Sequence, residues 1–226
     1  MNAARLTMRI LGLGALAAVG FFGATLARAL WLDAPTTAAP PAALTFDSSA
    51  DLTAGPAHAA VTVRIFGDYE CPACRALERN LGDTLLSLAR NGGIRLVYIH
   101  RPLAGRQDAG AAAALVACEP DPDLRWRLHA QLYAADHSAT AAPDVAFADR
   151  VRGLLAADSP RAACATSDSM ASRTAHAIAV ARAAGFHEVP TVVVNDRHVR
   201  FRSHQALLRR IHEAIADAGG QSAPTP

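Results

Sequence analysis

Two cysteines separated by a proline and an alanine lie where a β-rich run gives way to a helical one. The run before them, residues 61–66, is rich in β-branched and aromatic side chains and predicts a strand. Residues 75–90 carry leucines at intervals of three and four, which predict an amphipathic helix. The motif Cys71-Pro72-Ala73-Cys74 therefore falls at a helix start, where free N–H groups and the helix dipole stabilise a thiolate. The pattern predicts a dithiol/disulfide redox site.

Size, charge and histidine spacing exclude several other kinds of protein. At 226 residues the chain can bury one core, with room for an insertion. Its formal net charge is +2 and its arginines are spread along the chain, so it lacks the basic footprint of a nucleic-acid-binding protein. We expect neither a metal site nor a cofactor, because no histidine has ligand spacing beside the cysteines. Histidines such as His100, His129, His176 and His187 are interpreted as solvent-facing or capped.

The N-terminal segment, residues 1–32, has the form of an export signal. Arg5 and Arg9 precede an uncharged, apolar run at residues 10–27. A small-x-small cleavage site ends at Ala29, but the run is about 18 residues long, close to a short membrane span. The segment is therefore either cleaved near Ala29 or kept as an inner-membrane anchor, and a buried core helix is the less favoured alternative. Both favoured interpretations place the folded part in the periplasm or another extracytoplasmic space, because the positive flank stays inside.

Two further segments are expected to lack regular structure. Residues 33–56 are rich in Ala, Pro and Thr and predict a linker, in which residues 43–46 are a candidate for a short edge strand. Residues 219–226 are rich in Gly, Ser and Pro and predict a disordered tail. Residues 57–218 are thus the expected globular domain.

Within this domain, strands are predicted at both ends and helices between them. A second strand at residues 94–100 follows the first helix, and the order strand–helix–strand predicts a parallel pair. Asn195-Asp196 is a hairpin signal, so the final two strands are antiparallel and the sheet is mixed. The other predicted elements are helices at residues 107–118, 124–135, 145–156 and 161–184, strands at 191–194 and 198–201, and a helix at 203–218 with Ser203 as its N-cap. A break within the helix at 161–184 is an alternative.

This arrangement resembles the DsbA-like thiol:disulfide oxidoreductases, which have a thioredoxin fold with an inserted helical domain. The likeness covers residues 60–218 and rests on three segments: Phe66 to Cys74, Arg101-Pro102-Leu103, and Val189 to Asp196. A CxxC motif followed more than a hundred residues later by Val-Pro-Thr and an apolar strand is a specific combination. The resemblance implies an α/β fold with a thioredoxin-like mixed sheet, in which residues 105–185 form the helical insertion.

The resemblance also implies roles for the cysteines and for the loop that faces them. Cys71 would attack and leave, and Cys74 would resolve the mixed disulfide. Pro190 matches the cis proline of the family, and the cis form is accessible there because the residue is proline. The backbone of Val189 would pair with a substrate strand during the exchange.

Residues of the motif and of the loop before it are expected to meet the substrate. Pro72, Ala73 and Tyr69 are the candidates, with Asp68 beside them. The alternative for Asp68 and Tyr69 is a surface position that only shapes the loop. Ala73 stands where other members have histidine or tyrosine and adds no charge, so we expect a redox potential between about −120 and −200 mV.

Two further expectations follow from the comparison with the family. Cys118 and Cys164 are placed where relatives have a structural disulfide in the helical block, and two buried free thiols are the alternative. Ile65 occupies the position, six residues before Cys71, where relatives usually have a buried acid that helps to move the proton of Cys74. A water or a loop carboxylate would have to replace that acid.

The implied function is a protein disulfide oxidase outside the cytoplasm that acts on exported cysteine-containing proteins. A quinone-linked membrane enzyme, DsbB-like or VKOR-like (vitamin-K-epoxide-reductase-like), would reoxidise it. A disulfide reductase or isomerase of the same fold is one alternative, although residues 33–56 are too short and proline-rich for an isomerase's dimerisation module. We therefore expect a monomer. A Cu(I)-binding chaperone is a weaker alternative, because no Met- or His-rich tract accompanies the cysteines.

Overall fold

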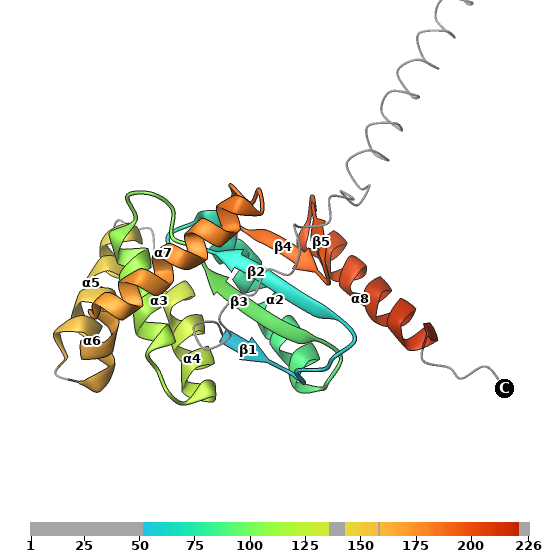
Figure 1. Cartoon of the computed structure of the whole chain (residues 1–226), viewed down its shortest axis with the longest axis horizontal. Coiled ribbons are helices and arrows are strands. Elements are labelled where there is room, and N and C mark those ends of the chain that lie inside the picture. Colours follow the sequence, from blue (N-terminus) through green and yellow to red (C-terminus); the bar gives the residue numbers. More distant parts are fainter. Residues whose placement is uncertain (1–51, 136–142, 158, 222–226) are drawn as a thin grey trace, which may run out of the picture. The chain divides into compact units, whose positions relative to one another are not determined.

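A five-stranded mixed sheet with the order β1-β3-β2-β4-β5 is the centre of the fold in the computed structural model (Figure 1). Strands β2 (Thr62–Gly67) and β3 (Arg95–His100) pair in parallel, as the order strand–helix–strand predicts. Strands β4 (Thr191–Val194) and β5 (Arg197–Val199) form the predicted antiparallel hairpin, and β4 pairs with β2. Asn195 turns the hairpin with a φ of 53°, a conformation that asparagine tolerates well. The predicted α/β mixed sheet is confirmed.

The structure describes residues 52–135, 143–157 and 159–221. The predicted export segment and the candidate strand at residues 43–46 lie outside the described residues. Among the helices of the described part, none combines the length and the hydropathy needed to cross a membrane.

The edge strand β1 (Leu52–Ala54) lies inside the segment predicted as a linker. It pairs antiparallel with β3, and the Leu52 side chain is buried. The indole of Trp126 donates a hydrogen bond to the Thr53 carbonyl and ties the strand to the helical insertion. Three residues show too little alternation for a strand pattern, so the prediction of a linker through residue 56 is corrected here.

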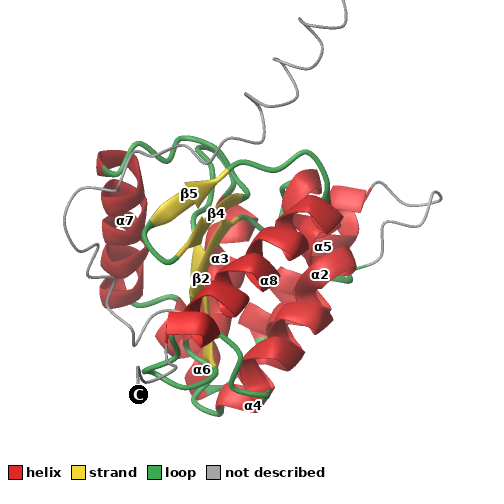
Figure 2. Cartoon of the chain, turned by 90° about the vertical axis from the view of Figure 1, so that its right-hand side faces the viewer, coloured by secondary structure: helices red, strands yellow, loops and turns green. Residues whose placement is uncertain are grey.

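Helices cover both faces of the sheet (Figure 2). Helices α2 (Pro72–Arg90) and α8 (His204–Gln221) lie on one face, and α7 (Asp168–Ala183) lies on the other. Alternate residues of β2 divide between the two faces: Ile65 belongs to the main core cluster with the buried leucines of α2, whereas Phe66 packs in a second cluster with residues of α7. Helix α8 includes residues 219–221, which were predicted to belong to the tail.

The helical insertion follows β3. It consists of α3 (Gln107–Ala117), α4 (Pro122–Tyr133), α5 (Pro143–Ala156), α6 (Pro160–Ala165) and α7. The helix predicted at residues 161–184, with a break as the alternative, is thus broken into two helices. Ser167 separates them, because its side chain accepts the Met170 N–H and caps α7.

A disulfide joins Cys118 and Cys164, as the resemblance implies. Cys118 caps the C-terminus of α3 and Cys164 lies in α6, with their Cα atoms 5.9 Å apart. The bond closes a loop with a sequence separation of 46 and fixes α6 against the first helix of the insertion.

Candidate active site

The first turn of α2 presents the CxxC motif. The helix begins at Pro72, in agreement with the expectation that the motif lies at a helix start, and Cys71 is its N-cap in extended backbone. Proline suits this position, because its fixed φ is helical and its missing N–H would have had no partner in the first turn. The Cys71 sulfur therefore lies beside the free N–H groups of Ala73 and Cys74, as the sequence predicts.

The two cysteines differ in acidity. The pKa of Cys71 is lowered to about 6, first by a hydrogen bond from the Cys74 thiol and then by the backbone N–H groups of Cys74 and Ala73, against the opposing effects of burial and of Asp68. The pKa of Cys74 is raised, because its proton is held by Cys71 and because its side chain is buried. Near neutral pH, Cys71 is therefore a thiolate that accepts a hydrogen bond from a protonated Cys74.

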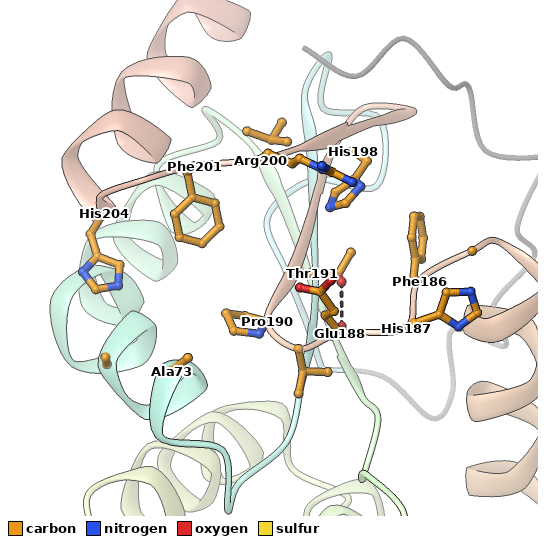
Figure 3. Close-up of a pocket in the computed structure, with 14 residues that line it drawn as sticks. Ala73, Phe186, His187, Glu188, Pro190, Thr191, His198, Arg200, Phe201 and His204 are labelled. Atoms are coloured by element: carbon orange, nitrogen blue, oxygen red, sulfur yellow. Dashed lines mark hydrogen bonds between the residues drawn. The ribbon is translucent and has the colours of Figure 1, made fainter. Parts of the chain in front are cut away.

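The loop before β4 faces the motif. The peptide bond between Val189 and Pro190 is cis, as the resemblance implies. The Cys71 Sγ lies 3.6 Å from the carbonyl oxygen of Val189. The Thr191 hydroxyl donates to the carbonyl of Glu188 at 2.7 Å and bridges the two sides of the proline (Figure 3). A partly exposed backbone segment thus stands next to the reactive sulfur.

A groove of about 790 Å³ opens along this loop (Figure 3). Its walls come from the first turns of α2, the loop before β4 and the segment from β5 to the start of α8. Ala73 and Val189 line it, whereas Pro72 is exposed at the start of α2 and is not among the lining residues. The other lining residues are Ala76, Gly185, Phe186, His187, Glu188, Pro190, Thr191, His198, Val199, Arg200, Phe201 and His204.

Comparison with known proteins agrees with this geometry. A sequence profile of the family described as thioredoxin matches residues 47–213. The chain belongs to the thioredoxin family. It is 30% identical over 157 residues to a Na(+)/H(+) antiporter NhaA of Nitrosospira multiformis, a match that covers 67% of this chain and 24% of that protein. It is 32% identical over 90 residues to a probable disulfide bond formation protein D of Bacillus cereus, with 39% and 42% covered.

The chain spans about a quarter of the length of the first of these relatives and less than half of the second. Among solved structures, α-DsbA1 of Wolbachia pipientis superposes with a TM-score of 0.62 at 13% sequence identity, covering 76% of this chain and 94% of that one. At this identity the superposition shows a shared fold. The thioredoxin-family domain described here therefore has the DsbA-like form of the fold, with its helical insertion.

Asp68 provides a buried carboxylate near the cysteines of this thioredoxin-family domain. The strand position where relatives have an acid is the buried, apolar Ile65. Asp68 has 1% of its surface exposed, and its negative charge raises the pKa of both cysteines. Its two carboxylate oxygens accept the N–H groups of Glu70 at 2.7 Å and Leu103 at 2.8 Å. It was predicted to line the substrate groove or to lie on the surface, and both predictions are wrong.

Glu70 ties the same loop to the helical insertion. Its Oε2 accepts the Ala109 N–H in the first turn of α3 at 3.0 Å. Burial is the main cause that raises the pKa of this carboxyl group. Arg75 donates to the Glu70 carbonyl at 3.3 Å, so its guanidinium lies over the loop. The loop before Cys71 is thus fixed from α2 and from α3.

Tyr69 does not line the groove. Its side chain is 1% exposed and points into the core, where its hydroxyl bonds His100 Nε2 at 2.7 Å and His129 Nδ1 at 2.9 Å. The prediction that Tyr69 contacts the substrate is wrong. His100 and His129 are buried rather than solvent-facing, whereas His176 and His187 are exposed as predicted.

These groups form a buried polar cluster beside α2. His129 Nε2 lies 3.6 Å from the Glu78 carboxylate, and the Tyr98 and Tyr133 hydroxyls bond each other. A hydroxyl has one proton, so Tyr69 donates to one imidazole and accepts from the other. Burial, together with the neighbouring His129, holds the pKa of His100 well below its ordinary value, so this ring is neutral. Within residues 52–135, 143–157 and 159–221, no three His, Cys, Asp or Glu side chains are grouped to hold a metal ion.

Proposed function

We propose that this chain is a thiol:disulfide oxidoreductase that exchanges its Cys71–Cys74 disulfide with exported cysteine-containing proteins, chiefly as a disulfide donor. The observation that carries the proposal is the difference in acidity between the two sulfurs, with the pKa of Cys71 lowered to about 6 and that of Cys74 raised. A thiolate of low pKa is a good leaving group and stabilises the reduced form, and both effects favour oxidation of the partner.

In the donor direction, a substrate thiolate attacks the Cys71 sulfur and forms a mixed disulfide. Cys74 leaves as a thiolate and takes up a proton, because its pKa is raised. A second substrate thiolate then attacks the substrate sulfur of the mixed disulfide. Cys71 leaves as a thiolate that Cys74 stabilises, and the two electrons lost by the substrate reside on the reduced cysteine pair.

The neighbourhood of Cys71 supports binding of an extended substrate segment. The Val189 carbonyl adjoins the reactive sulfur, and the groove that begins at Ala73 continues along the same loop. We propose that the substrate backbone pairs with Val189 while the side chains near its cysteine enter the groove. Pro72, exposed at the start of α2, would border this approach.

We also propose a location for the domain and an enzyme that reoxidises its cysteine pair. Residues 1–32 would export it, with cleavage near Ala29 or retention through the apolar run at residues 10–27. A disulfide donor ends each cycle reduced, so a quinone-linked membrane enzyme, DsbB-like or VKOR-like, would reoxidise it. The similarity to a probable disulfide bond formation protein D supports the role in disulfide formation on which this cycle depends.

The redox potential of the Cys71–Cys74 pair tests the proposal. The purified full chain is equilibrated with glutathione buffers, and a Cys118→Ala/Cys164→Ala variant isolates the reactive pair from the second disulfide. A donor is expected between about −120 and −200 mV. A value near that of thioredoxin, about −270 mV, would identify a reductase and overturn the donor assignment.

A further inference from the structure

The groove beside Pro190 is placed to receive the residues that flank a substrate cysteine. Ala73, between the two reactive cysteines in sequence, and Val189, whose carbonyl adjoins the Cys71 sulfur, both line it. A chain joined to Cys71 through a disulfide therefore has the groove beside it. Its volume of about 790 Å³ lies in the range of pockets that hold drug-sized ligands, so it can accept more than one side chain.

The apolar part of the groove lies close to the motif. Phe201 faces the groove from the segment that joins β5 to α8 (Figure 3). Phe186 lies on the opposite side of the loop, where it is buried against Phe66 in the second core cluster. Pro190 and Val199 add further apolar surface. Phe201, Pro190 and Val199 provide an apolar surface for a residue near the substrate cysteine, and this surface does not by itself select for charge.

The charged groups of the groove are distributed unevenly. Arg200 is exposed on the wall formed by β5 and the segment after it, whereas Glu188 lies on the facing loop and supplies the only carboxylate among the described lining residues. Burial first, and then Arg200, lower the pKa of His198, and Glu188 acts in the opposite direction. Arg200 therefore supplies the permanent positive charge of this wall.

Neighbouring residues strengthen the positive charge of the same wall. Arg197, three residues before Arg200 in sequence, is exposed as well. The acid of the hairpin, Asp196, lies 3.8 Å from the guanidinium of Arg64, which offsets its charge. His204, at the start of α8, also lines the groove. The wall formed by residues 197–204 is thus positively charged and borders an apolar groove.

We propose that this groove selects substrate segments in which a carboxylate lies near the reactive cysteine, with Arg200 as the residue that recognises it. The proposal rests on the disulfide exchange proposed above and adds a substrate class to it. In this proposal, a glutamate or aspartate near the substrate cysteine pairs with Arg200 while the cysteine is at Cys71. A lysine at the same place would put its ammonium against the guanidinium, so basic segments would be disfavoured.

The expected selectivity is modest. An exposed ion pair changes a rate constant by about two- to fivefold at low ionic strength. The effect should decrease as salt is added, because the Debye length falls to about 3 Å at 1 M. Apolar contacts in the groove are not screened in this way, so salt separates the two contributions.

The test uses the oxidised full chain and three single-cysteine peptides that differ only in a Glu, Gln or Lys near the cysteine, placed in turn on either side of it. The rate constant for mixed-disulfide formation at Cys71 is measured after acid quenching by mass spectrometry. Each value is divided by that for the same peptide with hydroxyethyl disulfide, because a neighbouring charge also changes the acidity of the peptide thiol. We expect the order Glu, Gln, Lys, with steps of about two- to fivefold that decrease in high salt.

Three variants complete the experiment. Arg200→Gln should lower the ratio of the Glu to the Lys rate constant, and Arg200→Glu should invert the preference. Arg127→Gln makes the same change of charge at an exposed position of α4, outside the groove, and should leave the ratio as it is. Equal rate constants for the three peptides, or an unchanged ratio in Arg200→Gln, would overturn the selectivity. Failure of every peptide and of dithiothreitol to reduce the Cys71–Cys74 disulfide would instead overturn the proposed function itself.

Discussion

The sulfur of Cys71 lies 3.6 Å from the carbonyl oxygen of Val189, although 118 positions separate the two residues in sequence. As a thiol, Cys71 can donate a hydrogen bond to this oxygen, whereas a thiolate has no proton to donate. Ionisation of Cys71 therefore relies on its other partners, Cys74 and the N–H groups of the first turn of α2. It also leaves the Val189 carbonyl open to a donor from a bound segment, which links the acidity of the cysteine to the loop where the substrate is proposed to lie.

The thiolate of Cys71 should form with a midpoint near pH 6 in the reduced chain. The hydrogen bond from Cys74 is the largest cause of the low pKa, so Cys74→Ala should raise the midpoint toward the ordinary value of about 8.5. Cys74→Ser keeps a donor and should raise it less. Thiolate absorbance against pH gives all three midpoints, and an alanine variant that still titrates near pH 6 would show that the helix N–H groups suffice.

Because Cys71 ionises more readily in the folded state, the free energy of unfolding of the reduced chain should rise between about pH 6 and about pH 8.5. In this window the unfolded cysteine keeps its proton while the folded one has lost it, so the unfolded state binds more protons and unfolding becomes less favourable as pH rises. The contribution is lost as pH falls through about 6. Urea unfolding of the reduced chain at several pH values, with Cys71→Ala as the reference, isolates this contribution from the other titrating groups. Parallel curves for the two proteins would contradict it.

The sequence predicts those parts of the site that depend on residues close together in the chain. A cysteine pair at the junction of a strand and a helix shows where the thiolate forms, and Asn195 shows the final hairpin. The likeness to the DsbA-like proteins adds Pro190 and the bond between Cys118 and Cys164, and the structure has both the cis peptide and the disulfide. The cysteine pair and the hairpin can be predicted from neighbouring residues alone, whereas Pro190 and the second disulfide depend on what the family resemblance implies about distant packing.

The rest of the site depends on contacts between distant segments. Tyr69 meets His100 and His129 across 31 and 60 positions, and nothing beside any of the three indicates that the others lie near. Polar side chains are usually exposed, so a solvent-facing interpretation follows when the partners are unknown. The end of α8 was predicted too early for a different reason. Glycine commonly follows a helix C-terminus, yet this helix continues through Gly219.

Loss of the second disulfide should destabilise the fold without changing the reactive pair. Cys118→Ala/Cys164→Ala opens a loop with a sequence separation of 46, for which the chain-entropy model gives about 3–4 kcal/mol. Denaturant unfolding of the oxidised variant and of the unmodified chain measures the difference. The redox potential of Cys71–Cys74 is the control and should be the same in both. A loss of less than about 1 kcal/mol would mean that the insertion is held mainly by packing.

Removal of the Tyr69 hydroxyl should cost stability and leave substrate binding unchanged. Tyr69→Phe deprives His100 Nε2 and His129 Nδ1 of a buried partner, which costs about 1–3 kcal/mol. Tyr133→Phe is the matched control, since it removes an equally buried hydroxyl that bonds Tyr98. Peptide exchange should show the same KM for Tyr69→Phe as for the unmodified chain. A raised KM with unchanged stability would restore the interpretation of Tyr69 as a substrate contact.

Asp68 should act on acidity and on stability in opposite directions. Its negative charge raises the pKa of Cys71, so Asp68→Asn should move the thiolate midpoint below about 6. The same change replaces one acceptor oxygen by an amide donor that faces the N–H of Glu70 or of Leu103. An unsatisfied buried donor costs about 1–3 kcal/mol, so the oxidised variant should unfold at lower urea concentration.

Asp83→Asn provides the matched control for this pair of effects. Asp83 is exposed on α2, so the substitution makes the same change of charge without removing an acceptor from the loop. Thiolate absorbance and urea unfolding should both stay close to those of the unmodified chain. A midpoint that rises in Asp68→Asn would mean that this carboxylate holds the loop in the geometry that stabilises the thiolate, and that this effect outweighs its charge. A midpoint that falls while stability also falls would show that Asp68 supports the fold at the expense of thiolate formation.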